Sequence, residues 1–251
     1  MRNLPALVVA ASIISLFGLC LPLVSRASDS VSRATAPDLF SKENIAALWI
    51  VPYDAKKRGP EDRAQMLREL GLTKLAYDWR NEHIPTFDAE IEAMQKHGVE
   101  ITAWWYPGRN TTILDAIKRH GIHPQLWVCG SRPIKGTTDA ERIEAEVARI
   151  RVIAEDAVAL GCKVGLYNHR EPWFEEQDHQ IAIIERLRRD GLTNVGIVFN
   201  FHHWRGSLAE FPALFKRIQL YLLAVNLNGM RAVPPSIPAY ASSAPTSRNW
   251  R

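Results

Sequence analysis

Seven short apolar runs are spaced along the chain, and longer stretches that mix apolar with charged residues separate them. The runs span residues 45–51, 73–79, 100–106, 125–129, 163–169, 194–203 and 220–228. Most positions within a run are apolar rather than alternately apolar and polar, which is typical of strands in a parallel sheet covered by helices. Each interval leaves room for one helix. The pattern therefore predicts a series of seven strand and helix units of the α/β class.

A glycine ends five of the mixed stretches shortly before the next apolar run. These glycines are Gly71, Gly98, Gly121, Gly161 and Gly191. Glycine adopts the left-handed conformation that terminates a helix, and several of these glycines follow cationic residues, which the negative end of the helix dipole favours. We therefore expect a helix to end and a strand to begin at each of them.

Two features favour a closed barrel over an open, doubly wound sheet. No glycine-rich loop of the form G-x-G-x-x-G follows the first run, where a dinucleotide-binding fold would need it. Polar residues follow nearly every run, at the rim where TIM barrels place their catalytic groups. They are Asp54, Asp78, Arg80, Tyr106, Arg132, Asn168, His169, Asn200, His203, Asn226 and Asn228. The sequence thus predicts a TIM (β/α) barrel with seven recognisable parallel strands.

The predicted barrel is incomplete at its carboxyl-terminal end. Residues 231–251 contain prolines and small residues without a periodic apolar pattern, so we expect a disordered tail rather than an eighth unit. The barrel domain would then span residues 45–230. Its first and seventh strands would keep open edges, which predict association, for example as a homo-oligomer.

The first 27 residues have the features of a secretory signal peptide. Arg2 precedes an apolar stretch from Leu4 to Val24, and Ser25-Arg26-Ala27 offers small residues at the positions that a cleavage site needs. This predicts a secreted or periplasmic protein with a linker at residues 28–44. An uncleaved membrane anchor is the alternative, because the apolar stretch is long enough to cross a bilayer.

Composition and charge exclude several other classes of protein. With 47% hydrophobic and 23% charged residues, the chain can form a folded core and is not a disordered protein. A formal net charge of +4 gives no indication of a nucleic-acid partner, and we expect none. No run after Val24 is apolar enough to span a bilayer. Cys129 and Cys162 should lie at opposite ends of neighbouring strands, too far apart for a disulfide, so we expect two free thiols.

Short motifs at the predicted strand ends carry a family resemblance. The fifth strand ends in Gly165-Leu166-Tyr167-Asn168-His169, and the sixth runs through Gly196-Ile197-Val198-Phe199-Asn200-Phe201-His202-His203. With the segments at 54–60, 77–80 and 82–83, these motifs resemble the xylose isomerase-like TIM barrels, the superfamily of sugar phosphate isomerases and epimerases. The resemblance extends over about residues 45–230. It implies a small-molecule sugar substrate and proton transfer next to the sugar carbonyl through an enediol.

The resemblance also implies a divalent metal, namely Mn, Mg, Zn or Co, held by residues of the last strands. His203 matches one ligand position, but Tyr167, Asn200 and Asn226 stand where typical members have Glu, Asp and His. Neutral amides replace carboxylates poorly as ligands of a hard cation. We therefore expect no tightly bound metal.

Proton transfer next to a carbonyl needs a base near the carbon-bound proton and a group that stabilises the developing oxyanion. The candidate acids and bases are His169, His203, Asp78 and Glu171. The candidate substrate-binding residues are Arg80, His83, Trp105, Tyr106, Asn168, Trp173, Asn200 and Asn226.

Structural alternatives exist for several of these residues. Asp78 can pair with a nearby arginine, and Glu171 can belong to a solvated acidic run with residues 175–178. His202 and His203 are predicted to alternate on a strand, so that only one of them faces the barrel mouth. Two other functions also stay open. One is a noncatalytic, sugar-binding remnant of such a barrel. The other is a glycoside hydrolase or lyase that uses two carboxylates, for which Asp78 and Glu171 are available.

Overall fold

Seven parallel strands lie in chain order in one sheet, in a computed structural model that describes residues 41–169 and 171–227. The strands are β1 (Ala47–Leu48), β2 (Lys74–Tyr77), β3 (Glu100–Trp105), β4 (Gln125–Val128), β5 (Val164–Tyr167), β6 (Val195–Asn200) and β7 (Leu222–Asn226). Each predicted strand is confirmed, although every one is shorter than the apolar run that predicted it.

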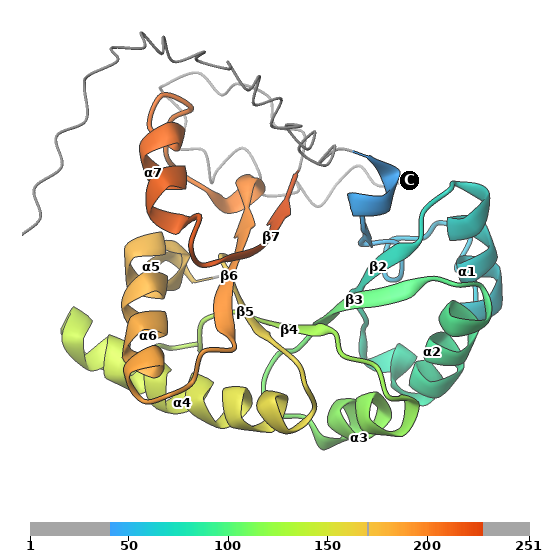
Figure 1. Cartoon of the computed structure of the whole chain (residues 1–251), viewed down its shortest axis with the longest axis horizontal. Helices are drawn as coiled ribbons and strands as arrows, with labels where there is room; N and C mark the ends of the chain where they lie inside the picture. Colours follow the sequence, from blue (N-terminus) through green and yellow to red (C-terminus); the bar gives the residue numbers. More distant parts are fainter. Residues whose placement is uncertain (1–40, 170, 228–251) are drawn as a thin grey trace, which may run out of the picture. The chain divides into compact units, whose positions relative to one another are not determined.

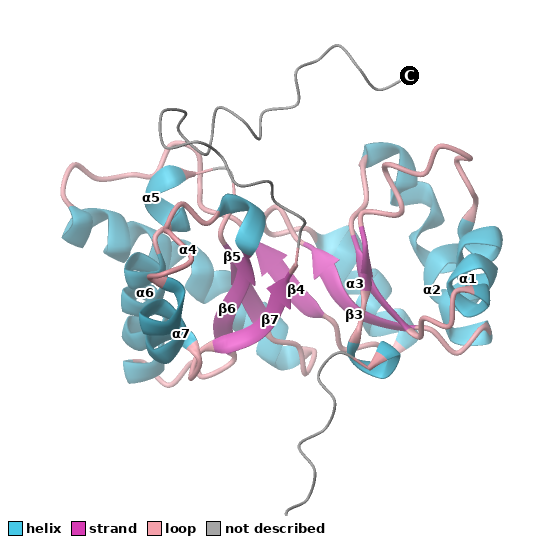
Figure 2. Cartoon of the chain, turned by 90° about the horizontal axis from the view of Figure 1, so that it is seen from above, coloured by secondary structure: helices cyan, strands magenta, loops and turns pink. Residues whose placement is uncertain are grey.

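Helices follow the strands and cover the outer side of the sheet. They are α1 (Pro60–Glu69), α2 (Phe87–Lys96), α3 (Thr111–His120), α4 (Asp139–Ala159), α5 (Pro172–Glu175), α6 (Gln177–Arg189) and α7 (Phe211–Ile218), with 3-10 turns η1 (Lys42–Asn44), η2 (Asn81–Thr86) and η3 (Phe201–His203). Figure 1 shows the strands in an arc with the helices on its convex side. From above, the strands lie between α1 and α2 on one side and α6 and α7 on the other (Figure 2). This is a TIM-type barrel.

The barrel is incomplete within the described residues. Every neighbouring pair of strands is parallel, but β1 pairs there with β2 alone and β7 with β6 alone. The expectation of open edges is therefore met in this part of the chain, and association through them stays a prediction.

The predicted helix ends at glycine are confirmed. Gly71, Gly98, Gly121, Gly161 and Gly191 all have φ between 60° and 88°. Such angles suit glycine, because a Cβ atom would be strained there. At the end of α3, Gly121 follows three basic residues that lie at the negative end of the helix dipole.

The sheet separates two apolar cores. The larger core lies between the sheet and its helices and contains residues such as Leu67, Ile91 and Trp104. The smaller one is made of strand residues alone, Ala76, Ala103, Trp127, Tyr167 and Val198, and fills the concave, inner face of the sheet. Because side chains alternate along a strand, residues two positions beyond these also face inward. The inner face therefore carries Asp78, Trp105 and Asn200 toward the carboxyl ends of the strands.

The two neighbouring tryptophans of β3 show this alternation. The ring of Trp104 packs against Phe87 of α2 at 5.1 Å between centroids, whereas the ring of Trp105 lies 5.5 Å from Tyr167 on the inner face. The two rings therefore lie on opposite faces of the sheet.

Several sequence predictions concern segments that the structure does not describe. The predicted signal peptide (1–27), most of the linker (28–44) and the tail (231–251) lie outside the described residues. None of the helices in the described ranges combines the length and the apolar character that crossing a bilayer requires. Cys129 follows β4 and Cys162 precedes β5, and both are thiols, as predicted.

Candidate functional site

Two imidazoles meet at the carboxyl ends of β5 and β6. His169 follows β5, and His203 lies in the η3 turn after β6. The centroids of their rings are 4.1 Å apart, with a tilt of 46° between the ring planes. Because β5 and β6 are parallel neighbours, both chains leave the sheet at the same edge. The structure thus brings together the two histidines that the sequence singled out.

The end of β6 differs from the expectation. The sequence analysis extended this strand to His203, with His202 and His203 alternating between its faces, and that prediction is wrong. The strand ends at Asn200, whose side-chain oxygen accepts a hydrogen bond from the backbone N–H of His202 at 2.9 Å. This bond caps a 3-10 turn instead of continuing the strand. The turn carries His203 to His169, and His202 packs edge-on against His203 at 4.9 Å.

A buried carboxylate completes the group. Glu175 is only 5% exposed, and its Oε2 accepts a hydrogen bond from Nη2 of Arg205 at 3.1 Å. One potential metal-ligand atom from each of His169, Glu175 and His203 lies within 4.8 Å of the other two. We call these three residues the rim cluster. Two imidazoles and one carboxylate are a donor set that binds a divalent transition metal in proteins.

Sequence reasoning missed Glu175, because it assigned residues 175–178 to a solvated acidic run. That assignment is wrong for Glu175, and packing explains why. Phe174 is fully buried, and a Cβ atom at Gly130 would lie 2.6 Å from its side chain, so the absence of a side chain at Gly130 lets Phe174 pack there. Phe174 holds α5 against the end of the barrel, and Glu175 follows it inward. Pro172 at the start of a helix and the cationic Arg205 were the available signals.

A second cluster lies on the inner face, where the resemblance places metal ligands. The hydroxyl of Tyr167 accepts hydrogen bonds from Nδ2 of Asn200 at 2.8 Å and from Nδ2 of Asn226 at 2.7 Å. All three side chains are buried. We call them the inner cluster. Burial raises the pKa of Tyr167, so the phenol stays neutral. A neutral hydroxyl and two amides are poor ligands for a divalent cation, so the candidate metal ligands lie in the rim cluster instead.

Asn168 has a different contact from its neighbours in the sequence. Its Nδ2 donates to the backbone oxygen of Asn200 at 3.0 Å, and its Oδ1 accepts from the backbone N–H of Asn200 at 2.6 Å. Asn168 is fully buried. Its amide therefore ties the ends of β5 and β6 together, and this fixes the spacing between the loops that carry His169 and His203.

Asp78 lies on the inner face beyond β2 and forms an ion pair. Oδ1 of Asp78 is 2.6 Å from Nη1 of Arg80, and Asp78 is 4% exposed. Burial lowers the pKa of Arg80, but the hydrogen bond and charge of Asp78 outweigh it, so the net shift is upward. The charge of Asp78 adds to the burial that raises the pKa of Tyr167. Asp78 is thus close enough to the inner cluster to act on it electrostatically.

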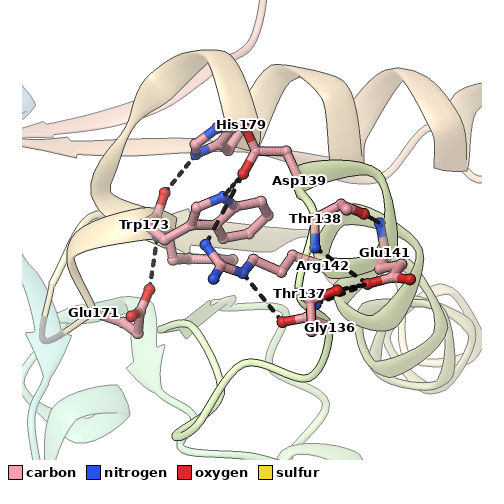
Figure 3. A network of polar contacts seen from close by, with 10 residues as sticks. Gly136, Thr137, Thr138, Asp139, Glu141, Arg142, Glu171, Trp173 and His179 are labelled. Carbon is pink, nitrogen blue, oxygen red and sulfur yellow. Dashed lines mark hydrogen bonds and ion pairs between the residues drawn. The ribbon is translucent and has the colours of Figure 1, made fainter.

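Glu171 and Trp173 hold the α5 segment in place (Figure 3). Oε2 of Glu171 accepts a hydrogen bond from the backbone N–H of Phe174 at 2.9 Å, which caps α5. Nε1 of Trp173 donates to Asp139 at 2.7 Å, and its ring stacks on His179 at 4.2 Å between centroids. These contacts tie α5 to the start of α4. Both residues therefore have structural contacts in the α5 segment.

Three other candidates differ in their contacts. Nδ1 of His83 accepts from the backbone N–H of Arg80 at 3.0 Å. The hydroxyl of fully buried Tyr106 accepts from the backbone N–H of Asn110 at 2.9 Å. Trp105 is half-buried, and its ring centroid lies 6.0 Å from that of His169. Trp105 therefore forms an aromatic wall beside the rim cluster.

One cavity adjoins the rim cluster, and a second has Trp105 in its lining. One, of about 660 Å³, is lined in part by Glu175, His203 and Arg205. The other, of about 540 Å³, lies on the Trp105 side and is lined in part by Arg132. Both volumes lie within the range of small-molecule sites.

Comparisons with known proteins identify the fold. No family model matches the chain, and a search of curated proteins found no match. Among solved structures, 3-keto-D-glucoside 4-epimerase YcjR from E. coli matches with a TM-score of 0.51 and 14% identity, over 73% of this chain and 78% of that chain. The probable 3-DHS dehydratase AsbF from Bacillus anthracis matches with a TM-score of 0.58 and 15% identity, over 75% of this chain and 74% of that chain.

A third match gives the fold its name. A xylose isomerase-like TIM barrel protein from Mycobacterium smegmatis, solved in complex with magnesium, has a TM-score of 0.51 and 12% identity, over 73% of this chain and 74% of that chain. The chain therefore has the fold of the xylose isomerase-like TIM barrels, and the resemblance inferred from its strand ends is confirmed at the level of the fold.

Proposed function

We propose that the protein is an exported carbohydrate isomerase or epimerase that moves a proton next to a sugar carbonyl. The observation that carries this proposal is the rim cluster, in which donor atoms of His169, Glu175 and His203 converge within 4.8 Å at the carboxyl end of the sheet. Catalytic groups of TIM barrels come from this end. The match in fold to an epimerase of 3-keto-D-glucosides supports the reaction class.

The rim cluster also bears on the metal that the resemblance implies. Two imidazoles with one carboxylate suit Zn²⁺ or Co²⁺, whereas Mg²⁺ prefers oxygen ligands and Mn²⁺ suits carboxylates. Three protein ligands leave a coordination position for substrate, as in catalytic rather than structural sites. A divalent ion bound there would act as a Lewis acid on the carbonyl oxygen of a sugar. In this proposal the ion is held by His169, Glu175 and His203. Another group must therefore act as the general base that accepts the proton.

Asp78 is the proton acceptor that the structure favours. It is a buried carboxylate on the inner face, and its negative charge reaches the neighbouring Tyr167. The ion pair with Arg80 holds the carboxylate in one orientation at 2.6 Å. Asp78 takes the proton from the carbon next to the carbonyl and returns it to the neighbouring carbon on the same face of the enediol, which converts an aldose into a ketose. Inversion of a single carbon would need a second acid on the opposite face. The half-buried face of Trp105 offers a stacking surface for the sugar ring.

Separate measurements of turnover and metal content test these roles. We expect Asp78→Asn to lower kcat about 100-fold on aldose, ketose and keto-sugar substrates, since general bases contribute that much or more, while metal content stays unchanged. His169→Ala should lower both turnover and metal content. Asp88→Asn, which changes a surface carboxylate paired with Arg119, is the matched control and should alter neither.

Other outcomes distinguish the alternatives. A wild-type protein that binds sugars without turning any of them over would contradict the proposal and favour a noncatalytic binding protein. Release of a sugar from a glycoside would favour a hydrolase or lyase, although Glu171, the second carboxylate of that hypothesis, caps α5. Export is tested by fractionating cells that produce the full chain and by sequencing the amino terminus of the mature protein, which we expect to begin near Ser28.

A further inference from the structure

Arginine recurs in the loops at the carboxyl end of the barrel. In the described residues it follows β1, β2, β3, β4 and β6, as Arg58, Arg80, Arg109, Arg132 and Arg205. These loops surround the end of the sheet that carries the rim cluster. A guanidinium group at this end that has no carboxylate partner in the protein would be available to an anionic ligand.

Most of these arginines already have a carboxylate partner. The partner is Asp54 for Arg58 at 2.7 Å, Asp78 for Arg80 at 2.6 Å, Asp156 for Arg109 at 2.8 Å and Glu175 for Arg205 at 3.1 Å. Arg132 is different. It is exposed, and no carboxylate of residues 41–169 or 171–227 lies within ion-pair distance of it.

Arg132 lines the cavity of about 540 Å³ on the Trp105 side. Arg109 and Arg149 line it too, but Asp156 pairs with the first and Glu146 with the second. The cavity therefore holds one positive charge in excess. A carboxylate or phosphate placed there would gain charge-assisted hydrogen bonds from the planar guanidinium.

Apolar residues also line this cavity, and one of them neighbours the rim cluster. Trp105, Val152 and Ile153 line it. The ring of Trp105 lies 6.0 Å from the ring of His169. Trp105 is thus shared between the cavity of Arg132 and the surroundings of His169. The volume is sufficient for a monosaccharide with one acidic substituent.

We infer that the substrate is an acidic monosaccharide, whose carboxylate or phosphate binds Arg132 in this cavity. This inference rests on the proposed function and adds the substrate class to it. Arg132 is then a specificity-determining residue: it distinguishes acidic from neutral sugars, and the rim cluster and Asp78 act on the carbonyl in either case.

The test compares matched sugars that differ only in the acidic group. D-Glucose, D-glucuronate and D-glucose 6-phosphate are offered to the full mature protein, and binding is followed by calorimetry and turnover by the appearance of the isomer or epimer. We expect KM and Kd to be at least tenfold lower for one of the acidic sugars than for glucose. The better acidic sugar identifies the source of the anion, a carboxylate or a phosphate. Raising the salt concentration should weaken this preference, because Arg132 is exposed.

Variants assign the preference to one side chain. Arg132→Ala should raise KM for the acidic sugar at least tenfold and leave glucose unchanged, and Arg132→Lys should restore part of the preference. Lys135→Ala, which removes an exposed positive charge from the same loop outside the cavity, is the control and should change KM by less than twofold.

Failure of this inference differs from failure of the proposed function. Equal KM values for neutral and acidic sugars, or an equal loss for both in Arg132→Ala, would overturn the inference and leave the proposed function standing. If neither kind of sugar is bound or converted, both are overturned.

Discussion

The inner cluster and the rim cluster both include residues at the ends of β5 and β6, but they differ in charge. Tyr167 and Asn200 of the inner cluster are separated by only two and three residues from His169 and His203 of the rim cluster. The inner cluster is neutral, buried and closed by two hydrogen bonds to one hydroxyl. The rim cluster contains a carboxylate that is paired with Arg205.

Depth in the barrel explains the difference. A charged group inside the inner core would lose its hydration without a counter-ion, at a cost of several kcal/mol. At the rim, the loop after β6 supplies Arg205 as a counter-ion, and a cavity opens onto the side chains of Glu175 and His203. The inner cluster is therefore neutral, whereas the charged group of the rim cluster comes from the segments that adjoin the strands. The following predictions test this division of roles.

The largest expected effect comes from Glu175→Gln. If the rim cluster holds the ion, its affinity for Zn²⁺ or Co²⁺ should fall at least about 100-fold, because changes to residues that only support a ligand already cost 10–100-fold. Competition with a chromophoric chelator measures the affinity, and the visible spectrum of the Co²⁺ form reports the loss of a ligand. Asn226→Ala, in the inner cluster, should leave the affinity unchanged. A larger loss in Asn226→Ala than in Glu175→Gln would reverse the assignment of the two clusters.

An intermediate effect, on stability rather than on metal binding, is expected for Tyr167→Phe. Removal of the hydroxyl leaves the amide donors of Asn200 and Asn226 buried without their acceptor, which costs about 1–3 kcal/mol. Denaturant unfolding should show this loss, whereas Zn²⁺ affinity should change little. Tyr53→Phe, at a ring that is 70% exposed, is the control. Unchanged stability with lost metal binding would show that the inner cluster, rather than the rim cluster, holds the ion.

The smallest expected effect distinguishes Glu171, the N-cap of α5, from Glu175 at the end of this helix. Glu171→Ala removes the side chain that caps this helix and should lower the free energy of unfolding by about 1 kcal/mol. Metal affinity and turnover should stay within a factor of two of wild type, because Glu175 keeps its position through Phe174. A loss of turnover as large as that in Asp78→Asn would give Glu171 a role in the reaction and revive the two-carboxylate hypothesis.

Local patterns in the sequence determined the framework of this protein. The apolar runs located all seven strands, and the glycines located five helix ends, because both depend on the intrinsic preferences of neighbouring residues. The parallel order of the strands also followed from local information, since one helix between consecutive strands returns the chain to the same end of the sheet. That order sufficed to bring His169 and His203 to one end of the barrel.

Tertiary packing decided the chemistry of the rim. Glu175 belongs to the site because Phe174 packs over Gly130, a contact between residues 44 positions apart in the sequence. The turn that carries His203 exists because the side chain of Asn200 accepts an N–H that a longer strand would have used. The ion pair of Asp78 with Arg80 was one of the alternatives that the sequence allowed. Only the curled sheet brings the charge of Asp78 close enough to act on Tyr167. Burial and partner choice depend on residues distant in the chain, so no local pattern could distinguish the buried Glu175 from its solvated neighbour Glu176.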